Sequence, residues 1–303
     1  MSISKAAAAA VSVTYNVVLI AAKLAAAILT GSVALLSEAL NSTIDLVASV
    51  IAFVAVRRAE VPADREHPYG HQKIESVAAT IEGMLIISVA GFIIFESVGR
   101  LLTGETAIES VGIGIVVIAF STVSAAVVAI FLRRQARLHS SPALEGDAAH
   151  LTADAITSFG VLLGLVAVQV TGAEWLDAAV AIALSVFIIV TGVNIIRKAA
   201  GTLVDEALPA EEMDRVEAAI ARARPLEVVG YHRLRARTAG TRRYIEMHVQ
   251  FRNGTTLEQA HSLAHDLRNA IEGEMRDSEV LIHVEPESSR RDPASEPEHY
   301  RAG

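Results

Sequence analysis

The chain has 303 residues, of which 52% are hydrophobic and 20% are charged, and its mean hydropathy is +0.43. Because soluble domains carry about a quarter charged residues, this composition argues against a wholly soluble protein. The formal net charge of −8 gives no support for nucleic acid as a partner. The chain has no cysteine, so any metal site must use histidine, carboxylate or amide ligands.

Six apolar segments follow one another in the first two thirds of the chain. A membrane helix needs about 20 apolar residues, and each segment is long enough to span a bilayer. The first segment follows Lys5 as a signal peptide would, but its length favours an uncleaved helix. We therefore expect an α-helical membrane protein with six transmembrane helices embedded in the lipid bilayer. The segments lie near residues 7–29, 33–56, 76–99, 108–132, 143–172 and 175–196.

Lysine and arginine residues mark one side of the predicted bundle. They follow the second, fourth and sixth segments, whereas the opposite loops hold Arg100 among several acidic residues. Since cytoplasmic loops retain positive charge, we expect a multi-pass protein of the inner (plasma) membrane with both termini in the cytoplasm. The residues that set this orientation are Arg57, Arg58, Arg65, Lys73, Arg133, Arg134, Arg137, Arg197 and Lys198.

The density of charged residues roughly doubles near residue 206, with 29 in the first 206 residues and 25 in the next 81. This change predicts a transmembrane domain over 1–206 and a soluble domain over 207–287. A disordered tail is expected over 288–303. In the soluble part, the pattern predicts an α+β fold of order αββαβ. Its helices are expected at 209–224 and 255–275, and its strands at 228–238, 242–252 and 280–284.

Two predicted membrane helices each carry a pair of polar residues four positions apart. Asn41 and Asp45 lie in the second helix, and His150 and Asp154 lie in the fifth. This spacing places each pair on one helix face. An ionisable group inside a span costs about 2.5–3.5 kcal/mol, so it needs a partner or a function. If the two faces meet, the four side chains can hold a divalent cation; the alternative is that they are helix-packing contacts.

The loop between the second and third segments offers a second candidate metal site. Asp64, His67 and His71 lie within eight residues, and the two histidines are four apart. A carboxylate and two imidazoles at this spacing can close around a divalent ion. The alternative is a polar cytoplasmic loop in which the carboxylates pair with Arg65 or Lys73.

The soluble domain is rich in histidine. Its two hairpin strands, its second helix and its last strand all carry histidine, and an acidic residue follows two positions after the last one. Isolated surface histidines are the plain alternative, but this density favours a metal site. The candidate ligands are His232, His248, His261, His283 and Glu285.

Several motifs of this sequence occur in the same order in one known protein family. They are the segment 31–36, the polar pairs on the second and fifth helices, the loop 64–75, and the segments 232–237 and 281–286. Together they resemble the cation diffusion facilitator family, in particular its bacterial zinc and ferrous-iron exporter branch. The resemblance extends from about Ser12 to Pro286.

This resemblance implies a homodimer that exports cytoplasmic Zn²⁺, Fe²⁺ or Mn²⁺ in exchange for protons. Such a protein is not an enzyme and has no prosthetic group; the divalent metal ions are its substrate and its regulatory ligands. The resemblance assigns the membrane pairs to the transport site and the loop residues to a second site. It assigns the soluble-domain residues to a binuclear site at the dimer interface of a metallochaperone-like fold.

Two residues depart from the pattern of this family. Asn41 stands where Asp or His is common, and Glu285 stands where Asp is common. An amide oxygen is neutral and harder than imidazole, which makes Mn²⁺ or Fe²⁺ more favourable than in a site with two imidazoles. A manganese- or cobalt/nickel-preferring member, a passive metal channel and a membrane metalloenzyme remain alternatives. No HExxH motif supports the last of these.

Overall fold

The computed structural model describes residues 3–30, 33–103, 112–173, 175–275 and 277–289. The chain divides into two compact units, Met1–Gly201 and Thr202–Gly303. Most of the tail expected to be disordered, residues 290–303, lies outside the described residues. Its first two residues belong to a short 3₁₀ helix, Glu287–Ser289.

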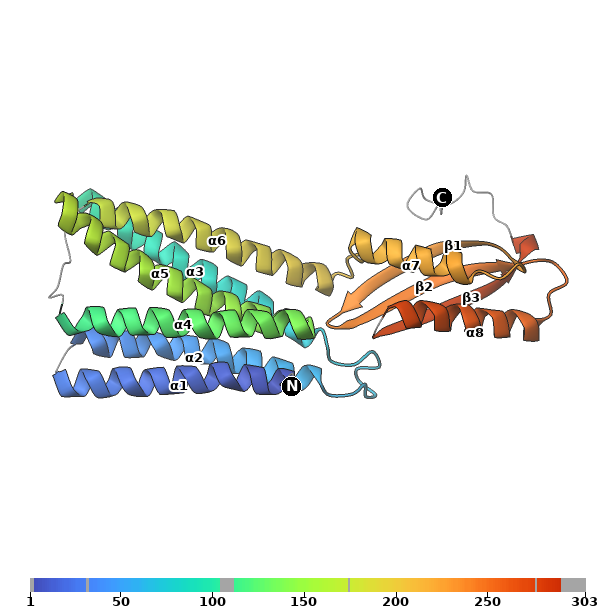
Figure 1. Cartoon of the computed structure of the whole chain (residues 1–303), viewed down its shortest axis with the longest axis horizontal. Coiled ribbons are helices and arrows are strands. Elements are labelled where there is room, and N and C mark those ends of the chain that lie inside the picture. The colour runs from blue at the N-terminus through green and yellow to red at the C-terminus, as the bar shows by residue number, and fades with distance from the viewer. Residues whose placement is uncertain (1–2, 31–32, 104–111, 174, 276, 290–303) are drawn as a thin grey trace. The chain divides into compact units, whose positions relative to one another are not determined.

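The first unit is a bundle of long helices that run side by side (Figure 1). Each has 26–30 residues, more than the 20 or so that cross a hydrocarbon core. Among the described residues, α1, α3 and α6 are apolar enough to be candidate spans, with mean hydropathy of 1.8, 2.2 and 2.5. The helices are α1 (Lys5–Thr30), α2 (Val33–Ala59), α3 (Ile74–Thr103), α4 (Gly112–His139), α5 (Pro142–Thr171) and α6 (Trp175–Leu203).

Small residues let these helices approach closely. Gly83 on α3 and Gly192 on α6 face one another, and a Cβ on either would lie 3.1 Å from the carbonyl oxygen of the other. Buried alanines serve the same purpose among the other helices, for example Ala8, Ala55, Ala129 and Ala148. A buried polar group in so tight a bundle needs a partner within the protein or an enclosed water.

Polar contacts join helix ends at one end of the bundle. Lys5 Nζ donates to Glu75 Oε1 at 2.8 Å, and the Ser141 hydroxyl donates to the other carboxylate oxygen of Glu75. These contacts connect the beginnings of α1, α3 and α5. We call this end of the bundle the Lys5 end; the last residues of α2, α4 and α6 lie there too (Figure 1).

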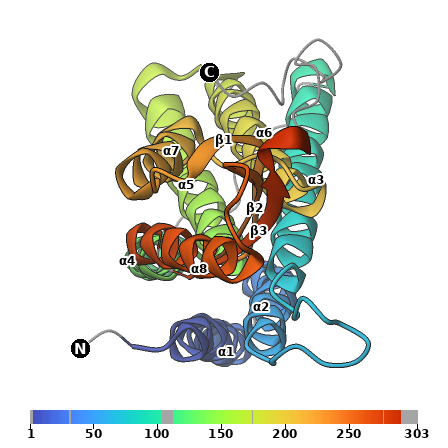
Figure 2. The same ribbon diagram turned by 90° about the vertical axis from the view of Figure 1, so that its right-hand side faces the viewer.

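The second unit is a three-stranded sheet with two helices on one face (Figure 2). Its elements are α7 (Ala210–Ala223), β1 (Val228–Ala239), β2 (Arg242–Phe251), α8 (Leu257–Glu274) and β3 (Ser278–Pro286). β1 and β2 form an antiparallel hairpin, and β3 pairs in parallel with β2. Parallel strands need a long crossover, and α8 supplies it. Ile245, Met247 and Val249 of β2 join the core, so the residues between them lie on the opposite face.

Candidate metal sites

The bundle brings together three of the four side chains expected to form the transport site. His150 Nε2 on α5 lies 3.2 Å from Asp45 Oδ1 on α2 and 3.8 Å from Asp154 Oδ2 on α5. His150 is buried and the two aspartates are partly buried. One ligand atom from each residue falls within 4.8 Å of the others, close enough to share one cation. Asn41 belongs to the same helix as Asp45, but its side chain lies outside the described part of the chain.

A second polar cluster lies on α5 toward the Lys5 end. Asp147, which is 0% exposed, accepts hydrogen bonds from Ser12 and Ser49, both at 3.0 Å. Asn16 Nδ2 donates to Ser49 Oγ at 2.7 Å. Asp147 precedes His150 by three positions and so lies on nearly the same helix face. The cluster therefore continues the polar surface of the candidate transport site along the helix.

Glu82 on α3 is the most isolated polar group in this region. It is 0% exposed, and neither carboxylate oxygen has a hydrogen-bond partner among the described residues. It packs against Gly146 of α5, where an added Cβ would lie 2.5 Å from Glu82 Oε2. The sequence motifs gave no role to either Glu82 or Asp147. The three-residue spacing of Asp147 from His150 was the available signal.

The loop after α2 also gathers its predicted residues. Asp64 Oδ1 accepts hydrogen bonds from the backbone N–H groups of Glu66 and His67, at 2.9 and 2.7 Å. His67 Nδ1 lies 3.3 Å from Asp64 Oδ1, and His71 Nε2 lies 3.4 Å from Asp64 Oδ2. The backbone hydrogen bond from His67 is the main reason that the pKa of Asp64 is lowered, so this carboxylate stays ionised and ready to ligate. A positive φ of 84° at Gly70 lets the chain turn back between the two histidines.

Three adjacent strands place three histidines in one row on the open face of the sheet. His232 of β1 pairs with His248 of β2, and His248 pairs with His283 of β3. Neighbouring rings are 5.1 and 4.7 Å apart between centroids. Glu285 lies two residues beyond His283 and hence on the same face. This row depends on the parallel pairing of β3, which the chain order alone does not determine.

Glu285 is at the centre of this row. Its carboxylate oxygens lie 3.0 Å from His232 Nε2, 2.7 Å from His248 Nδ1 and 3.7 Å from His283 Nε2. Partial burial raises the pKa of Glu285, but hydrogen bonds and charge from His248 and His232 outweigh it, and the net pKa is lowered. An ionised carboxylate among three imidazoles is a donor set suited to Zn²⁺ and similar ions.

His261 does not join this group. It is exposed on α8, one of the helices on the other face of the sheet from the histidine row. The neighbouring candidate, His265, also exposed, has its Nδ1 2.8 Å from Arg268 Nη2. Within one chain, the described cluster therefore consists of His232, His248, His283 and Glu285.

Comparison with known proteins matches both units. Residues 9–204 match the cation efflux transmembrane domain, and residues 208–287 match the cytoplasmic domain of cation efflux proteins. The chain is 32% identical over 291 residues to the cation-efflux pump FieF of Klebsiella pneumoniae, covering 94% of this chain and 93% of that protein. It is 35% identical over 266 residues to the uncharacterized transporter sll1263 of Synechocystis sp., covering 87% and 84%.

Among solved structures, the metal-bound C-terminal domain of the CzcD transporter from Thermotoga maritima is 32% identical. It covers 25% of this chain and 87% of that chain, with a TM-score of 0.24.

A transmembrane domain followed by this cytoplasmic domain defines a membrane transporter of metal cations. The chain belongs to the cation efflux family, the cation diffusion facilitators. The resemblance found in the sequence is thereby confirmed, and the protein is a divalent metal efflux transporter rather than an enzyme.

Proposed function

We propose that the protein exports a divalent transition-metal cation in exchange for protons, and that the cation binds between α2 and α5. Asp45, His150 and Asp154 are its ligands, together with Asn41. The observation that carries this proposal is the convergence of Asp45 with His150 across two helices, at 3.2 Å. Two carboxylates neutralise a divalent ion, which removes most of the cost of placing a charge inside a membrane.

Competition between protons and metal at these ligands gives the coupling. Metal binding needs ionised carboxylates and a neutral imidazole, so it releases protons, and protonation releases the metal. His150 lies beside both aspartates. Its imidazole can therefore hold a proton that pairs with a carboxylate, or lose that proton and bind the metal ion. An inward proton gradient then drives metal outward when the site faces each side in turn.

All six helices of the bundle are long enough to cross a membrane, with 26–30 residues each. We propose that α1 to α6 all do so, with residues 1–206 as the transport domain and both termini in the cytoplasm of the cell. Arginine and lysine at the Lys5 end support this orientation under the positive-inside rule. They include Arg57, Arg58, Arg133, Arg134, Arg137 and Arg197.

The donor set bears on the choice of metal. Two carboxylates, one amide and one imidazole offer more oxygen than nitrogen, and such sites accept Mn²⁺ and Fe²⁺ as well as Zn²⁺. We propose these three ions as cargo. A manganese- or cobalt/nickel-preferring member is the alternative, distinguished by competition among the ions in one assay.

The cytoplasmic domain, residues 207–287, is proposed to sense metal. Three histidines share one carboxylate, Glu285, and this arrangement supports a binuclear site with Glu285 as the bridging ligand. We propose that His261 contributes when two chains form a homodimer, since it stands apart from the cluster within one chain. The loop residues Asp64, His67 and His71 are proposed as a third site.

Reconstituted vesicles test this function. Wild-type protein in proteoliposomes with an imposed pH gradient is expected to move Zn²⁺ and Mn²⁺ against protons, and collapsing the gradient should stop accumulation. Asp154→Asn keeps the side-chain shape but removes a charged ligand, so accumulation should fall at least tenfold. Asp266→Asn, the same change at an exposed residue of α8, is the control. Undiminished metal flux with no pH dependence would contradict antiport and indicate a passive channel.

A further inference from the structure

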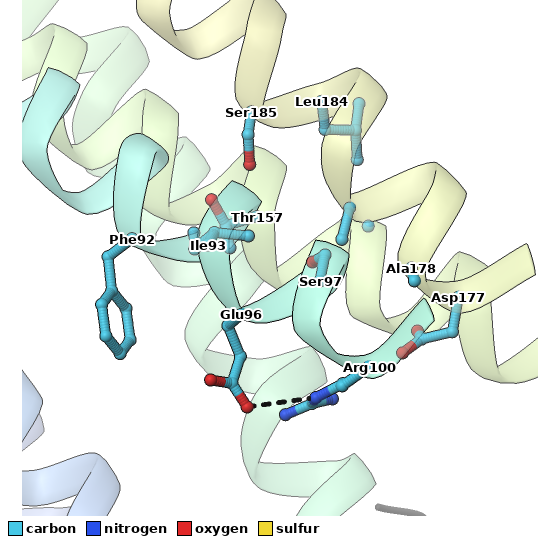
Figure 3. Close-up of a pocket in the computed structure, with 12 residues that line it drawn as sticks. Phe92, Ile93, Glu96, Ser97, Arg100, Thr157, Asp177, Ala178, Leu184 and Ser185 are labelled. Carbon is cyan, nitrogen blue, oxygen red and sulfur yellow. Dashed lines mark hydrogen bonds and ion pairs between the residues drawn. The ribbon is translucent and has the colours of Figure 1, made fainter. Parts of the chain in front are cut away.

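A cavity of about 200 Å³ lies between α3, α5 and α6 (Figure 3). Its lining residues on α3 lie near the last residues of that helix, at the end of the bundle opposite the Lys5 end. The cavity is large enough for several water molecules. We call it the outer cavity. Residues that matter for its chemistry are Ile93, Glu96, Ser97, Thr157, Asp177 and Ser185.

A second, smaller cavity lies between the outer cavity and the candidate transport site. It has a volume of about 10 Å³, enough for about one water. His150 and Asp154 line it, and it shares two lining residues, Ile93 and Thr157, with the outer cavity. Ile93 and Thr157 therefore form the partition between the two spaces. Thr157 lies one helical turn beyond Asp154 on α5, so the two cavities follow one face of that helix.

Two buried serine residues line the outer cavity. Ser185 of α6 is 1% exposed and Ser97 of α3 is 6% exposed. No hydrogen bond joins either hydroxyl to another described residue. Figure 3 shows the Ser185 hydroxyl directed toward Thr157 and Ile93. Unpaired hydroxyls in a membrane interior are costly, so these two indicate a polar occupant, either water or a hydrated ion.

The charges around the outer cavity favour a cation. Asp177 and Glu96 contribute two carboxylates, whereas Arg100 contributes one guanidinium. Glu96 and Arg100 pair along α3, with 3.3 Å between Glu96 Oε1 and Arg100 Nε. Asp177 is partly buried against Gly164, where a Cβ would lie 2.2 Å from Asp177 Oδ1. The arrangement leaves the Asp177 carboxylate as net negative charge beside a space large enough for several water molecules.

We propose that the outer cavity is a second cation site, which holds the hydrated divalent cargo between the Asp154 site and the far side of the membrane. Asp177 attracts the ion, Ser97 and Ser185 accept its water shell, and Ile93 with Thr157 forms the gate. The proposal rests on the proposed transport function. It extends that function by giving the ion a staged route along α5, in which dehydration takes place at the gate.

The absence of cysteine from this chain makes a direct test possible. Ser185→Cys introduces a single thiol of nearly the same size, and Ser97→Cys is a second, independent variant. Each is reconstituted in vesicles and treated with membrane-impermeant methanethiosulfonates, one cationic and one anionic. The control is Ser88→Cys, an exposed position on the outer surface of α3 that faces lipid in the bilayer.

The proposal predicts three results. The thiol of Ser185→Cys should react at least tenfold faster than that of Ser88→Cys. Its ratio of reaction rates with the cationic and the anionic reagent should exceed the ratio for a free thiol in solution several-fold. Asp177→Asn should remove most of that preference, and millimolar Mn²⁺ or Zn²⁺ should slow the reaction. If the thiols of Ser185→Cys and Ser97→Cys both react as slowly as that of Ser88→Cys, the outer cavity is dry or filled with lipid, and the proposal is overturned. A reactive thiol with no charge preference would overturn its cation specificity.

Failure of the transport function gives a different result. Thiol labelling needs no metal flux, whereas the proposed function is tested by the loss of accumulation in Asp154→Asn. Vesicles with normal labelling but no accumulation in the wild type contradict antiport alone.

Discussion

Replacing Glu285 with glutamine tests the bridging role of this residue in the cytoplasmic cluster. The change keeps the size of the side chain and removes its charge. In the structure, the two carboxylate oxygens of Glu285 separately approach His232 at 3.0 Å and His248 at 2.7 Å. A glutamine replaces one of these two oxygens with an NH₂ group, so it offers no second acceptor oxygen to the rings and cannot bridge two metal ions as an anion.

The expected loss of affinity follows from the charge. A divalent ion about 2.1 Å from a carboxylate oxygen gains about 4 kcal/mol even at the dielectric constant of water. The carbonyl oxygen of glutamine can still bind the metal ion and so restores part of this binding free energy. The loss should therefore lie between about tenfold and about a thousandfold in the dissociation constant, since 1.4 kcal/mol is a factor of ten.

Calorimetric titration of the purified full chain with Zn²⁺ measures this loss. The background variant carries Asp154→Asn and Asp64→Asn, which weaken the other two candidate sites. Glu279→Gln on the same strand is the matched control, because Glu279 is exposed and lies 3.7 Å from Arg242 rather than in the cluster. Affinity within twofold of the background in Glu285→Gln would refute the bridging role.

Three further changes test the packing and charges of the fold. Gly192→Ala places a Cβ 3.1 Å from a facing backbone oxygen, so thermal unfolding should show a loss of about 1–3 kcal/mol in stability. Gly91→Ala is the control, because its new Cβ meets nothing within 4 Å, and it should leave stability unchanged. Equal losses of stability in the two variants would contradict the close packing at Gly192. Thr256→Ala removes the side-chain acceptor of the α8 capping box and should cost about 1 kcal/mol of unfolding free energy, which serine in its place restores. Hydrogen bonds from Arg243 lower the pKa of Glu212, so their stabilisation is complete above the ordinary glutamate pKa and lost as pH falls through the lowered value. Glu212→Gln should thus reduce stability by about 1 kcal/mol at pH 7 and make no difference in strong acid; a pH-independent difference would refute the assignment.

The sequence predicted the site residues on α2 and α5 because helical periodicity is local. A spacing of four residues places His150 and Asp154 on one face whatever the rest of the fold does. It cannot show that Asp45 on another helix approaches that face, since helix contacts depend on small residues such as Gly83 and on the whole bundle. The family resemblance supplied that information before the structure did.

The cytoplasmic cluster shows the same limit in a sheet. The hairpin turn fixes the antiparallel register from Ala239 back to Arg235, and an irregularity between Arg235 and His232 shifts it by one residue, so that His232 lies beside His248. The register of β3 depends on the α8 crossover and on core packing, so the position of His283 beside His248 had no local signal. The buried groups Asp147 and Glu82 were missed because a lone acidic residue in an apolar segment does not reveal its partners.

The position of the bound cation decides whether α2 and α5 form the transport site. Crystals of the full chain loaded with Zn²⁺ or Mn²⁺, measured at the absorption edge of the metal, locate the ion by its anomalous scattering. We expect a peak between α2 and α5, at a ligand distance of about 2.0–2.2 Å from Asp45, His150 and Asp154, and its loss in Asp154→Asn. Anomalous peaks confined to the loop and the cytoplasmic domain, with none between these helices, would contradict it.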